Sequence, residues 1–245
     1  MCCSVAICRY SKDIISSVRL VLYLVTYVTY ITTQRILMRF SINRHSVQEV
    51  YTYNTYYSRE IQLLTGKIQE IILSIASMRP NPGIIELIST LAKEGWDVLV
   101  LTDANSVFVN HWLKVHGLQE AVTAVVTNRA FWKQDRLYIE PCMRQTTCPR
   151  CPSNLCKSIA LAQWCSSRDY QRYVYSGDGR NDYCPATNLP ADAIVFPRKG
   201  YPMYDLIKKT LSSPNPQIKA KVVPWDDAFT ILEELFPGKN KTTKS

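Results

Sequence analysis

The stretch YVYSGDGRNDYCP, residues 173–185, runs from a short apolar segment into a glycine-rich turn that carries two carboxylates. Asp178 follows this segment directly, and Asp182 comes four residues later. Carboxylate oxygens are the ligands that Mg²⁺ prefers, with water in its other coordination positions. The glycines let the backbone turn tightly around the two acids. We interpret the stretch as a strand that ends in a magnesium-binding loop, whereas an isolated Gly-Asp-Gly would indicate an ordinary turn.

Short apolar segments alternate with amphipathic segments on both sides of this stretch. The expected strands are 96–102, 121–128, 173–177, 192–196 and 221–225, and the expected helices are 58–78, 84–95, 105–118, 153–167, 201–211 and 226–236. Gly95 is expected to end the second helix, and Ser153 or Asn154 to cap the fourth. Continuous apolar strands that alternate with helices are typical of a parallel sheet covered on both faces. The sequence therefore predicts an α/β fold with a Rossmann-like parallel sheet and helices on both faces.

Functional side chains of such folds lie at the carboxyl ends of the strands. Thr102 and Asp103 follow the strand expected over 96–102, and Asn105 stands at the start of the next helix. A hydroxyl beside a helix N-terminus is a good phosphate ligand, because backbone N–H groups and the helix dipole favour an anion there. The alternative is that Thr102 or Asp103 only caps the helix. Lys157, on a later helix, could reach the same pocket and neutralise a phosphate, although an isolated helix lysine is usually only solvated.

Composition indicates a globular chain of one or two domains. The 245 residues are 47% hydrophobic and 20% charged. The net charge of +9 is spread along the chain, and only the C-terminal residues 239–244 form a basic cluster. Because no basic helix or aromatic stacking motif accompanies the charge, we expect no nucleic-acid partner.

Nine cysteines are many for this length, and their odd number argues against a disulfide scaffold. No clear secretory signal is evident, so we expect a reducing compartment, the cytoplasm. Cys148 and Cys151 form a single C-x-x-C within CMRQTTCPRCPSNLC, residues 142–156, and no second pair or histidine completes a standard zinc spacing. Free thiols in a loop are the expected state, and a structural zinc site is the alternative.

The N-terminal region contains an uncharged segment, residues 20–34, rich in β-branched and aromatic residues. It is shorter than the roughly 20 apolar residues of a membrane-spanning helix, and arginines flank it. A membrane anchor is one interpretation, and a buried helix or strand is the commoner one. A third is that the segment does not belong to the working protein.

Several motifs, taken in order, resemble the haloacid dehalogenase superfamily of phosphatases. They are VLVLTDAN, TNRAFWKQDRLYIEP, CPRCPSNLCKS, YVYSGDGRNDYCP, IVFPRKGYPMYDLI and VVPWDDA. The resemblance is closest to the small branch that acts on phosphoethanolamine, phosphocholine or pyridoxal 5′-phosphate, and it covers residues 80–236. It implies a haloacid-dehalogenase-like core with a helical cap, a small phosphomonoester substrate and Mg²⁺ as cofactor.

The resemblance also implies roles for single residues. In that family one aspartate attacks the phosphorus, and a second aspartate, two residues later, protonates the leaving group. Thr102 matches the phosphate-binding Ser/Thr, and Asp103 matches a substrate contact. Lys157 matches the lysine that stabilises nucleophile and phosphate, Asp178 matches a magnesium ligand, and Asp182 matches the second acid of the metal loop.

The chain departs from the family at the nucleophile. The family carries a D-x-D-x-T run at the end of its first, central strand, and no such run occurs here. No residue therefore matches the nucleophile or the general acid, and the sheet would have a gap in its middle unless residues 20–31 fill it. One hypothesis is a phosphomonoesterase, impaired as written, whose N-terminus is atypical through an alternative start, altered splicing or an error in exon assignment. The other is a non-catalytic relative that binds metal or phosphate without turnover.

These considerations divide the chain into four parts. Residues 1–57 are expected to be an atypical N-terminal segment and residues 58–79 a remnant of the helical cap. Residues 80–236 are expected to form the phosphatase-like core, and residues 237–245 a basic tail.

Overall fold

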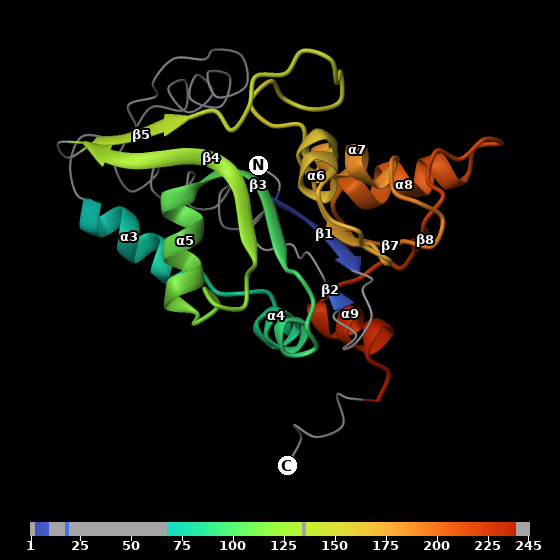
Figure 1. Ribbon diagram of the computed structural model, residues 1–245, viewed down its shortest axis with the longest axis horizontal. Helices are drawn as coiled ribbons and strands as arrows, with labels where there is room; N and C mark the ends of the chain where they lie inside the picture. Colours follow the sequence, from blue (N-terminus) through green and yellow to red (C-terminus); the bar gives the residue numbers. More distant parts are fainter. Residues whose placement is uncertain (1–2, 10–17, 20–67, 134–135, 239–245) are drawn as a thin grey trace.

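The computed structural model describes residues 3–9, 18–19, 68–133 and 136–238 (Figure 1). The uncharged segment 20–34, the first part of the expected cap helix and the basic tail lie outside these residues. Among the described residues, no helix combines the length and the apolar character that a membrane span requires.

One sheet of eight strands organises the described part of the chain. The order across the sheet is β5 (Arg136–Glu140), β4 (Ala124–Lys133), β3 (Leu99–Asn105), β1 (Cys3–Arg9), β6 (Val174–Gly177), β7 (Ile194–Pro197) and β8 (Lys221–Val222), with β2 (Val18–Arg19) paired to β1. Strand β3 is parallel to β4, and β6, β7 and β8 are parallel to one another. The predicted α/β class is therefore confirmed. The predicted parallel pairing is confirmed for β3 with β4 and for β6, β7 and β8. Strands β1, β2 and β5, which the sequence did not predict, add antiparallel pairings.

Helices cover both faces of the sheet, as predicted (Figure 1). One layer contains α3 (Ile68–Ala76), α4 (Ile84–Lys93), α5 (Ser106–Val115) and α9 (Ala228–Leu235), and the other contains α6 (Lys157–Cys165), α7 (Tyr183–Ala186) and α8 (Pro202–Leu211). Helix α3 contacts α5 and α4 contacts α9, while α7 contacts both α6 and α8. Right-handed crossovers explain this division, because β3–α5–β4 and β6–α7–β7 run in opposite directions across the sheet.

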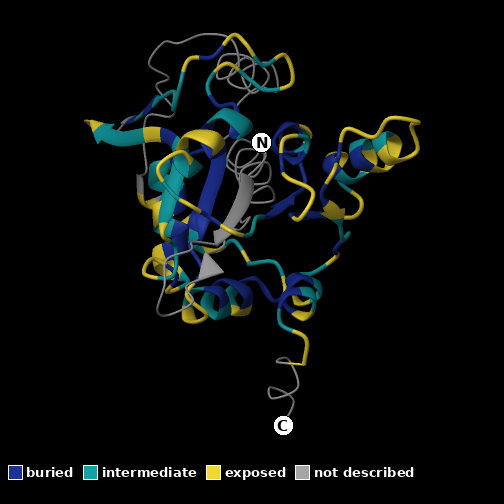
Figure 2. Ribbon diagram, turned by 45° about the vertical axis from the view of Figure 1, so that its right-hand side comes forward, coloured by how far each residue is buried: buried dark blue, intermediate teal, exposed yellow. Residues whose placement is uncertain are grey.

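The core lies between the sheet and these layers, and strands β3, β6 and β7 are largely buried in it, with β3 dark blue in Figure 2. Residues 99–102 of β3 and all four residues of β7 are buried, as the continuous apolar segments predict. Helix α4 buries one stripe at helical spacing, made of Ile84, Leu87, Ile88 and Leu91. Each such side chain stabilises the fold by about 1.5–3 kcal/mol relative to exposure.

Helix α6 begins later than the sequence predicts. Its N-cap is Cys156, with an extended backbone at φ −94° and ψ 111°, so the expected cap at Ser153 or Asn154 is wrong. The reason is a competing backbone interaction. The Ser153 carbonyl accepts from the Gln145 N–H at 2.9 Å, and the Asn154 carbonyl accepts from the Met143 N–H at 3.0 Å. The chain before α6 is thereby held as a compact loop against residues 143–145.

Strand β1 fills the middle of the sheet, between β3 and β6, and the sequence did not predict it. Val5 lies opposite Val100 on one side and opposite Ser176 on the other, and both pairings are antiparallel. Residues 20–31, proposed to fill this gap, lie outside the described residues. Since β1 is reversed, its amino-terminal end lies at the carboxyl edge of the sheet, with Cys3 opposite Thr102.

The central position of β1 predicts a large response to proline. Val5→Pro removes an N–H from a strand bonded on both sides and leaves a buried carbonyl without its donor, which costs about 1–3 kcal/mol. We expect urea unfolding, followed by circular dichroism, to show a loss of at least this size in the free energy of unfolding.

The edge strand β8 supplies the control. The amides of Lys221 and Val223 donate to the carbonyls of Ala193, just before β7, and Val195 in β7, so the intervening Val222 N–H points away from β7. Val222→Pro should change stability far less than Val5→Pro. Equal effects of the two substitutions would contradict the central placement of β1.

Candidate functional site

The candidate site lies where β3 and β6 end at the carboxyl edge of the sheet. Leu101 of β3 is level with Val126 of β4, and Asn105 is level with Asn128, so β3 carries extra residues in a bulge. Thr102 and Asp103 lie in this bulge, which re-aims side chains at the strand end. Residues 177–182, here called the metal loop because the sequence predicts a metal site there, begin at the last residue of β6 and end with the short helix η1 (Arg180–Asp182).

A buried ion pair holds the metal loop against α6. Lys157 Nζ lies 2.8 Å from Asp182 Oδ1, and both side chains are fully buried. The Tyr175 hydroxyl donates to the same oxygen at 3.1 Å. The backbone N–H groups of Asp178 and Gly179 donate to Asp182 Oδ2 at 3.1 and 2.8 Å. Asp182 is therefore arranged to orient Lys157, and direct metal coordination by Asp182 would require one of these contacts to break.

Asp178 differs, because neither of its carboxylate oxygens has a hydrogen-bond partner among the described residues, although both are buried. Asn181 Oδ1 is buried without a partner in the same way. Buried oxygens without donors are costly unless a cation or water meets them. The oxygen donors of Asp178 and Asn181 thus fit a hard cation such as Mg²⁺, which prefers carboxylate and carbonyl oxygens.

Burial is the main cause of the raised pKa values of Asp178 and Asp182. It raises the pKa of Asp178 to about 7, with the positive charges of Lys157 and Arg198 opposing the rise. Burial also raises the pKa of Asp182, and the amides of Gly179 and Asp178 oppose it. A cation at Asp178 would replace the proton that burial otherwise favours.

Close packing at Gly177 makes the ion pair possible. A Cβ atom at this position would lie 2.2 Å from Met203 Sδ and 2.8 Å from Asp182 Cβ. The methionine could move, but Asp182 Cβ is fixed by the turn of the metal loop. Glycine is therefore required here for close approach, whereas the sequence suggested a tight turn as the reason.

Asp103 contacts the metal loop, whereas its neighbours Thr102 and Asn105 form local hydrogen bonds with the backbone. Asn181 Nδ2 donates to Asp103 Oδ2 at 3.5 Å, which links the ends of β3 and β6. Thr102 Oγ1 accepts from the Ala104 N–H at 3.0 Å. Asn105 caps α5, since its side chain accepts from the Phe108 N–H. The cap of α5 is thus neither Thr102 nor Asp103, and Asn105 already has a structural partner.

Sequence reasoning missed two residues that shape the site. Asn128 donates to the carbonyls of Asp103 and Ala104 at 2.7 and 2.8 Å, which fixes the bulge of β3. Arg198 follows β7 and has one buried guanidinium nitrogen without a partner in the described part of the chain. Asn128 is the last residue of the strand predicted over 121–128, and Arg198 lies two residues after the strand predicted over 192–196. These positions near strand ends were the available signal.

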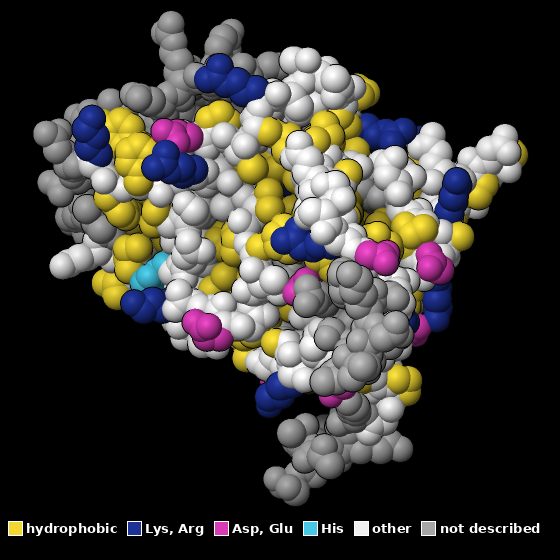
Figure 3. Space-filling view, in the orientation of Figure 1, with side chains coloured by type: hydrophobic (Ala, Val, Ile, Leu, Met, Phe, Trp, Pro, Cys, Tyr) yellow, Lys and Arg dark blue, Asp and Glu magenta, His cyan; other side chains and the backbone are white. Residues whose placement is uncertain are grey.

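Basic side chains do not gather into one surface on the face shown in Figure 3. The dark blue Lys and Arg groups are scattered there, and Asp and Glu side chains lie among them. This distribution agrees with the scattered charge of the sequence.

Comparisons with known proteins identify relatives of this chain. The family model described as "Putative Phosphatase" matches residues 32–238. The "Probable phosphatase phospho1" of Danio rerio is 31% identical over 197 residues, which cover 75% of this chain and 70% of that protein. The pyridoxal phosphate phosphatase PHOSPHO2 of Rattus norvegicus is 32% identical over 177 residues, 69% of this chain and 73% of that one. The phosphoethanolamine/phosphocholine phosphatase of Homo sapiens is 31% identical over 193 residues, 75% and 72% of the two chains.

The buried ion pair predicts an asymmetric response to substitution. Lys157→Met leaves the Asp182 carboxylate buried without its counter-charge, and breaking a buried pair in this way costs about 3–5 kcal/mol. Adding Asp182→Asn to Lys157→Met should restore part of this loss. Urea unfolding of both variants measures the difference.

An exposed ion pair provides the matched control. Arg129 and Glu140 form a salt bridge of 3.0 Å with side chains that are 73% and 45% exposed. Arg129→Met should cost less than about 1 kcal/mol. If Lys157→Met is as mild as Arg129→Met, the Lys157–Asp182 pair does not hold the metal loop.

Proposed function

The chain belongs to the "Putative Phosphatase" family, within the haloacid dehalogenase superfamily of phosphatases, and we propose that it binds a small phosphomonoester and Mg²⁺ at the carboxyl edge of its sheet. The observation that carries this proposal is the Asp178 carboxyl group, buried with both oxygens unpartnered in the described part of the chain. It lies on the loop that Lys157 and Asp182 fix by their 2.8 Å ion pair. Phosphoethanolamine, phosphocholine and pyridoxal 5′-phosphate are the candidate substrates, because the relatives in Homo sapiens and Rattus norvegicus are phosphatases named for these compounds.

Each residue of the site has a separate role in the proposed binding of Mg²⁺ and phosphate. Asp178 holds Mg²⁺, with Asn181 as a second oxygen donor, and Mg²⁺ supplies charge neutralisation for the phosphate oxygens. Asp182 fixes the position of the Lys157 ammonium group, which neutralises negative charge on the phosphate. Thr102 and Asp103, in the bulge of β3, contact phosphate and substrate. Asn105 acts on the site through the capping of α5.

We further propose that turnover is impaired in this chain. Hydrolysis in this superfamily needs a carboxylate at the carboxyl end of the central strand. Here the central strand β1 reads CSVAICR, contains no acid, and runs in the opposite direction. The same observation favours the second candidate, a non-catalytic relative that binds metal or phosphate without turnover.

The pKa of Asp178 predicts how Mg²⁺ binding depends on pH. With a folded pKa of about 7, above its unfolded value, the protonated acid stabilises the metal-free protein. This contribution is fully present below the unfolded pKa and is lost as the pH rises through about 7. Mg²⁺ requires the carboxylate, so its affinity should rise about tenfold per pH unit below the folded pKa and level off above it. Titration calorimetry with MgCl₂ between about pH 5 and pH 9 measures this.

Two variants test the assignment to Asp178. Asp178→Asn should weaken Mg²⁺ binding and abolish its pH dependence. Asp205→Asn, on the exposed face of α8, should leave both unchanged. An unaltered Mg²⁺ titration in Asp178→Asn would refute the proposed metal site.

An assay of phosphate release tests whether turnover by this chain is impaired. We expect the natural chain to hydrolyse phosphoethanolamine, phosphocholine and pyridoxal 5′-phosphate, with Mg²⁺, at least about 10³-fold more slowly than a chimera whose N-terminal segment is replaced by a D-x-D-x-T strand. The physical reason is that only the chimera places a nucleophile in the middle of the carboxyl edge.

A chimera with asparagine in place of both grafted aspartates is the matched control and should match the natural chain. Turnover by the natural chain that Asp178→Ala abolishes would show catalysis without a D-x-D motif. That result would overturn the proposed impairment and leave the proposed metal site in place.

A further inference from the structure

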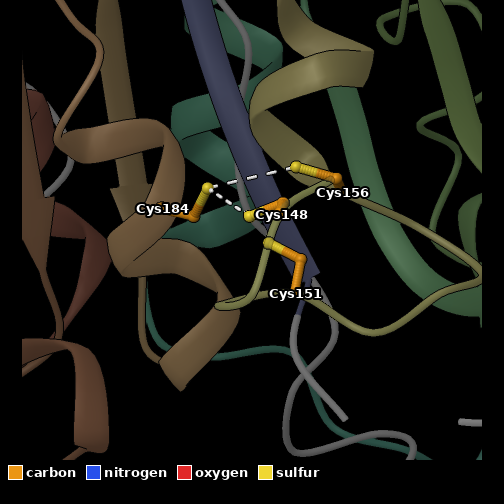
Figure 4. A group of neighbouring side chains, drawn as sticks. All are labelled: Cys148, Cys151, Cys156 and Cys184. Atoms are coloured by element: carbon orange, nitrogen blue, oxygen red, sulfur yellow. Dashed lines mark hydrogen bonds between the residues drawn. The ribbon is translucent and has the colours of Figure 1, made fainter. Parts of the chain in front are cut away.

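Four cysteine side chains converge beside the metal loop (Figure 4). Cys148 and Cys151 lie on the loop before α6, Cys156 is the N-cap of α6, and Cys184 lies in α7. Their four Sγ atoms all lie within 4.8 Å of one another, and all four thiols are free. We propose that these cysteines bind one Zn²⁺ ion, in a structural site separate from the proposed magnesium site.

The distances between the sulfur atoms fit a tetrahedral metal site. Four thiolates at about 2.3 Å from Zn²⁺ lie about 3.8 Å from one another. Cys148 Sγ is 3.5 Å from Cys184 Sγ, and Cys156 Sγ is 4.0 Å from it. A disulfide would need the two sulfur atoms at about 2.05 Å. Tetrahedral coordination by four sulfur atoms is typical of zinc or of iron–sulfur sites, and this compact arrangement fits a single ion.

Neighbouring side chains hold the C-P-R-C turn, residues 148–151, in shape. The buried amide of Gln145 donates to the carbonyls of Cys148, Cys151 and Pro152 at 3.3, 3.1 and 2.9 Å. Its oxygen accepts from the Cys148 N–H at 2.8 Å. Hydrogen bonds of this kind around the ligands orient them and raise metal affinity. The hydrogen bonds from Gln145 thus hold the turn in a fixed conformation beside the four sulfur atoms.

Arg150 fastens the same turn to the other side of the cluster. Its guanidinium group donates to Thr187 Oγ1 at 3.2 Å, just after α7, and to Gln217 Oε1 at 3.0 Å. Four thiolates around Zn²⁺ carry a net charge of −2, so a cation fixed nearby stabilises them. Arg150 therefore contributes both position and charge.

Zn²⁺ would bind the four cysteines as thiolates, because the thiolate and not the thiol is the metal ligand. Metal binding would therefore form four Zn–S bonds and release the thiol protons to solvent.

Such a site would connect the two segments that meet in the Lys157–Asp182 pair. Cys156 directly precedes Lys157, and Cys184 follows Asp182 by two residues. Cys151 Sγ also contacts the Asn181 carbonyl at 4.0 Å. Zn²⁺ would thus tie α6 to the metal loop, whether or not the chain turns over a phosphate ester.

Metal analysis of the full-length chain tests the proposal. We expect protein purified under reducing conditions from zinc-supplemented cells to contain one Zn²⁺ per chain by inductively coupled plasma mass spectrometry. Cys148→Ser and Cys184→Ser should each weaken Zn²⁺ binding by more than about 100-fold, and Gln145→Ala by about 10- to 100-fold. Cys142→Ser and Cys165→Ser are matched controls outside the cluster and should keep full zinc content.

A spectroscopic measurement keeps the test independent of folding in the variants. Co²⁺ exchanged into the unaltered chain should show the thiolate-to-cobalt charge-transfer bands and intense visible bands of tetrahedral sulfur coordination. Zinc content near zero with all four thiols reactive, a disulfide between any two of the four, or octahedral Co²⁺ would each overturn the proposal. None of these readouts involves phosphatase activity, so a failed phosphatase assay leaves the zinc result intact.

Discussion

The contact between Lys157 and Asp182 is the constraint on which the site depends. Taking two charges out of water costs several kcal/mol per ion, and their attraction offsets this only when further hydrogen bonds complete the geometry. Tyr175 on β6 and two amides of the metal loop provide these bonds. The pair therefore fixes β6, the start of α6 and the metal loop relative to one another. Gly177 is part of the same constraint, because any side chain there would push Asp182 away.

Strand β1 shows that the fold and the chemistry place different demands on the central strand. A sheet needs only a strand whose N–H and C=O groups meet those of its neighbours, and an antiparallel strand satisfies that need. Catalysis in this superfamily also needs a carboxylate at one end of the strand, and therefore a direction. Strand β1 meets the first demand between β3 and β6, but its reversed course brings Cys3 to the edge where the nucleophile would stand.

Local patterns predicted much of this fold, and long-range pairing explains what they missed. The apolar segments at 99–101 and 194–196 became buried strands, as continuous apolar segments of this length indicate for a sheet covered on both faces. The direction of β1 depends on partners far away in the sequence, and no local signal encodes it. Cys184 was missed as a partner of the C-x-x-C for the same reason, since the fold alone brings α7 beside the loop before α6. The start of α6 was misplaced because backbone pairing to residues 143–145 outweighed the capping preference of Ser153 and Asn154.

The proposed zinc and magnesium sites share one segment without competing for one ion. The cluster offers soft sulfur ligands, which select Zn²⁺, and Asp178 offers hard oxygen, which suits Mg²⁺. The residues of the ion pair are close in sequence to the cluster, with Lys157 next to Cys156 and Asp182 two residues before Cys184. A metal that fixes both cysteines would reduce the conformational entropy that Asp178 and Lys157 lose when a cation and a phosphate bind. The zinc-bound cysteines would thus make the segment around Lys157 and Asp178 more rigid, while Asp178 and Lys157 would bind Mg²⁺ and the phosphate.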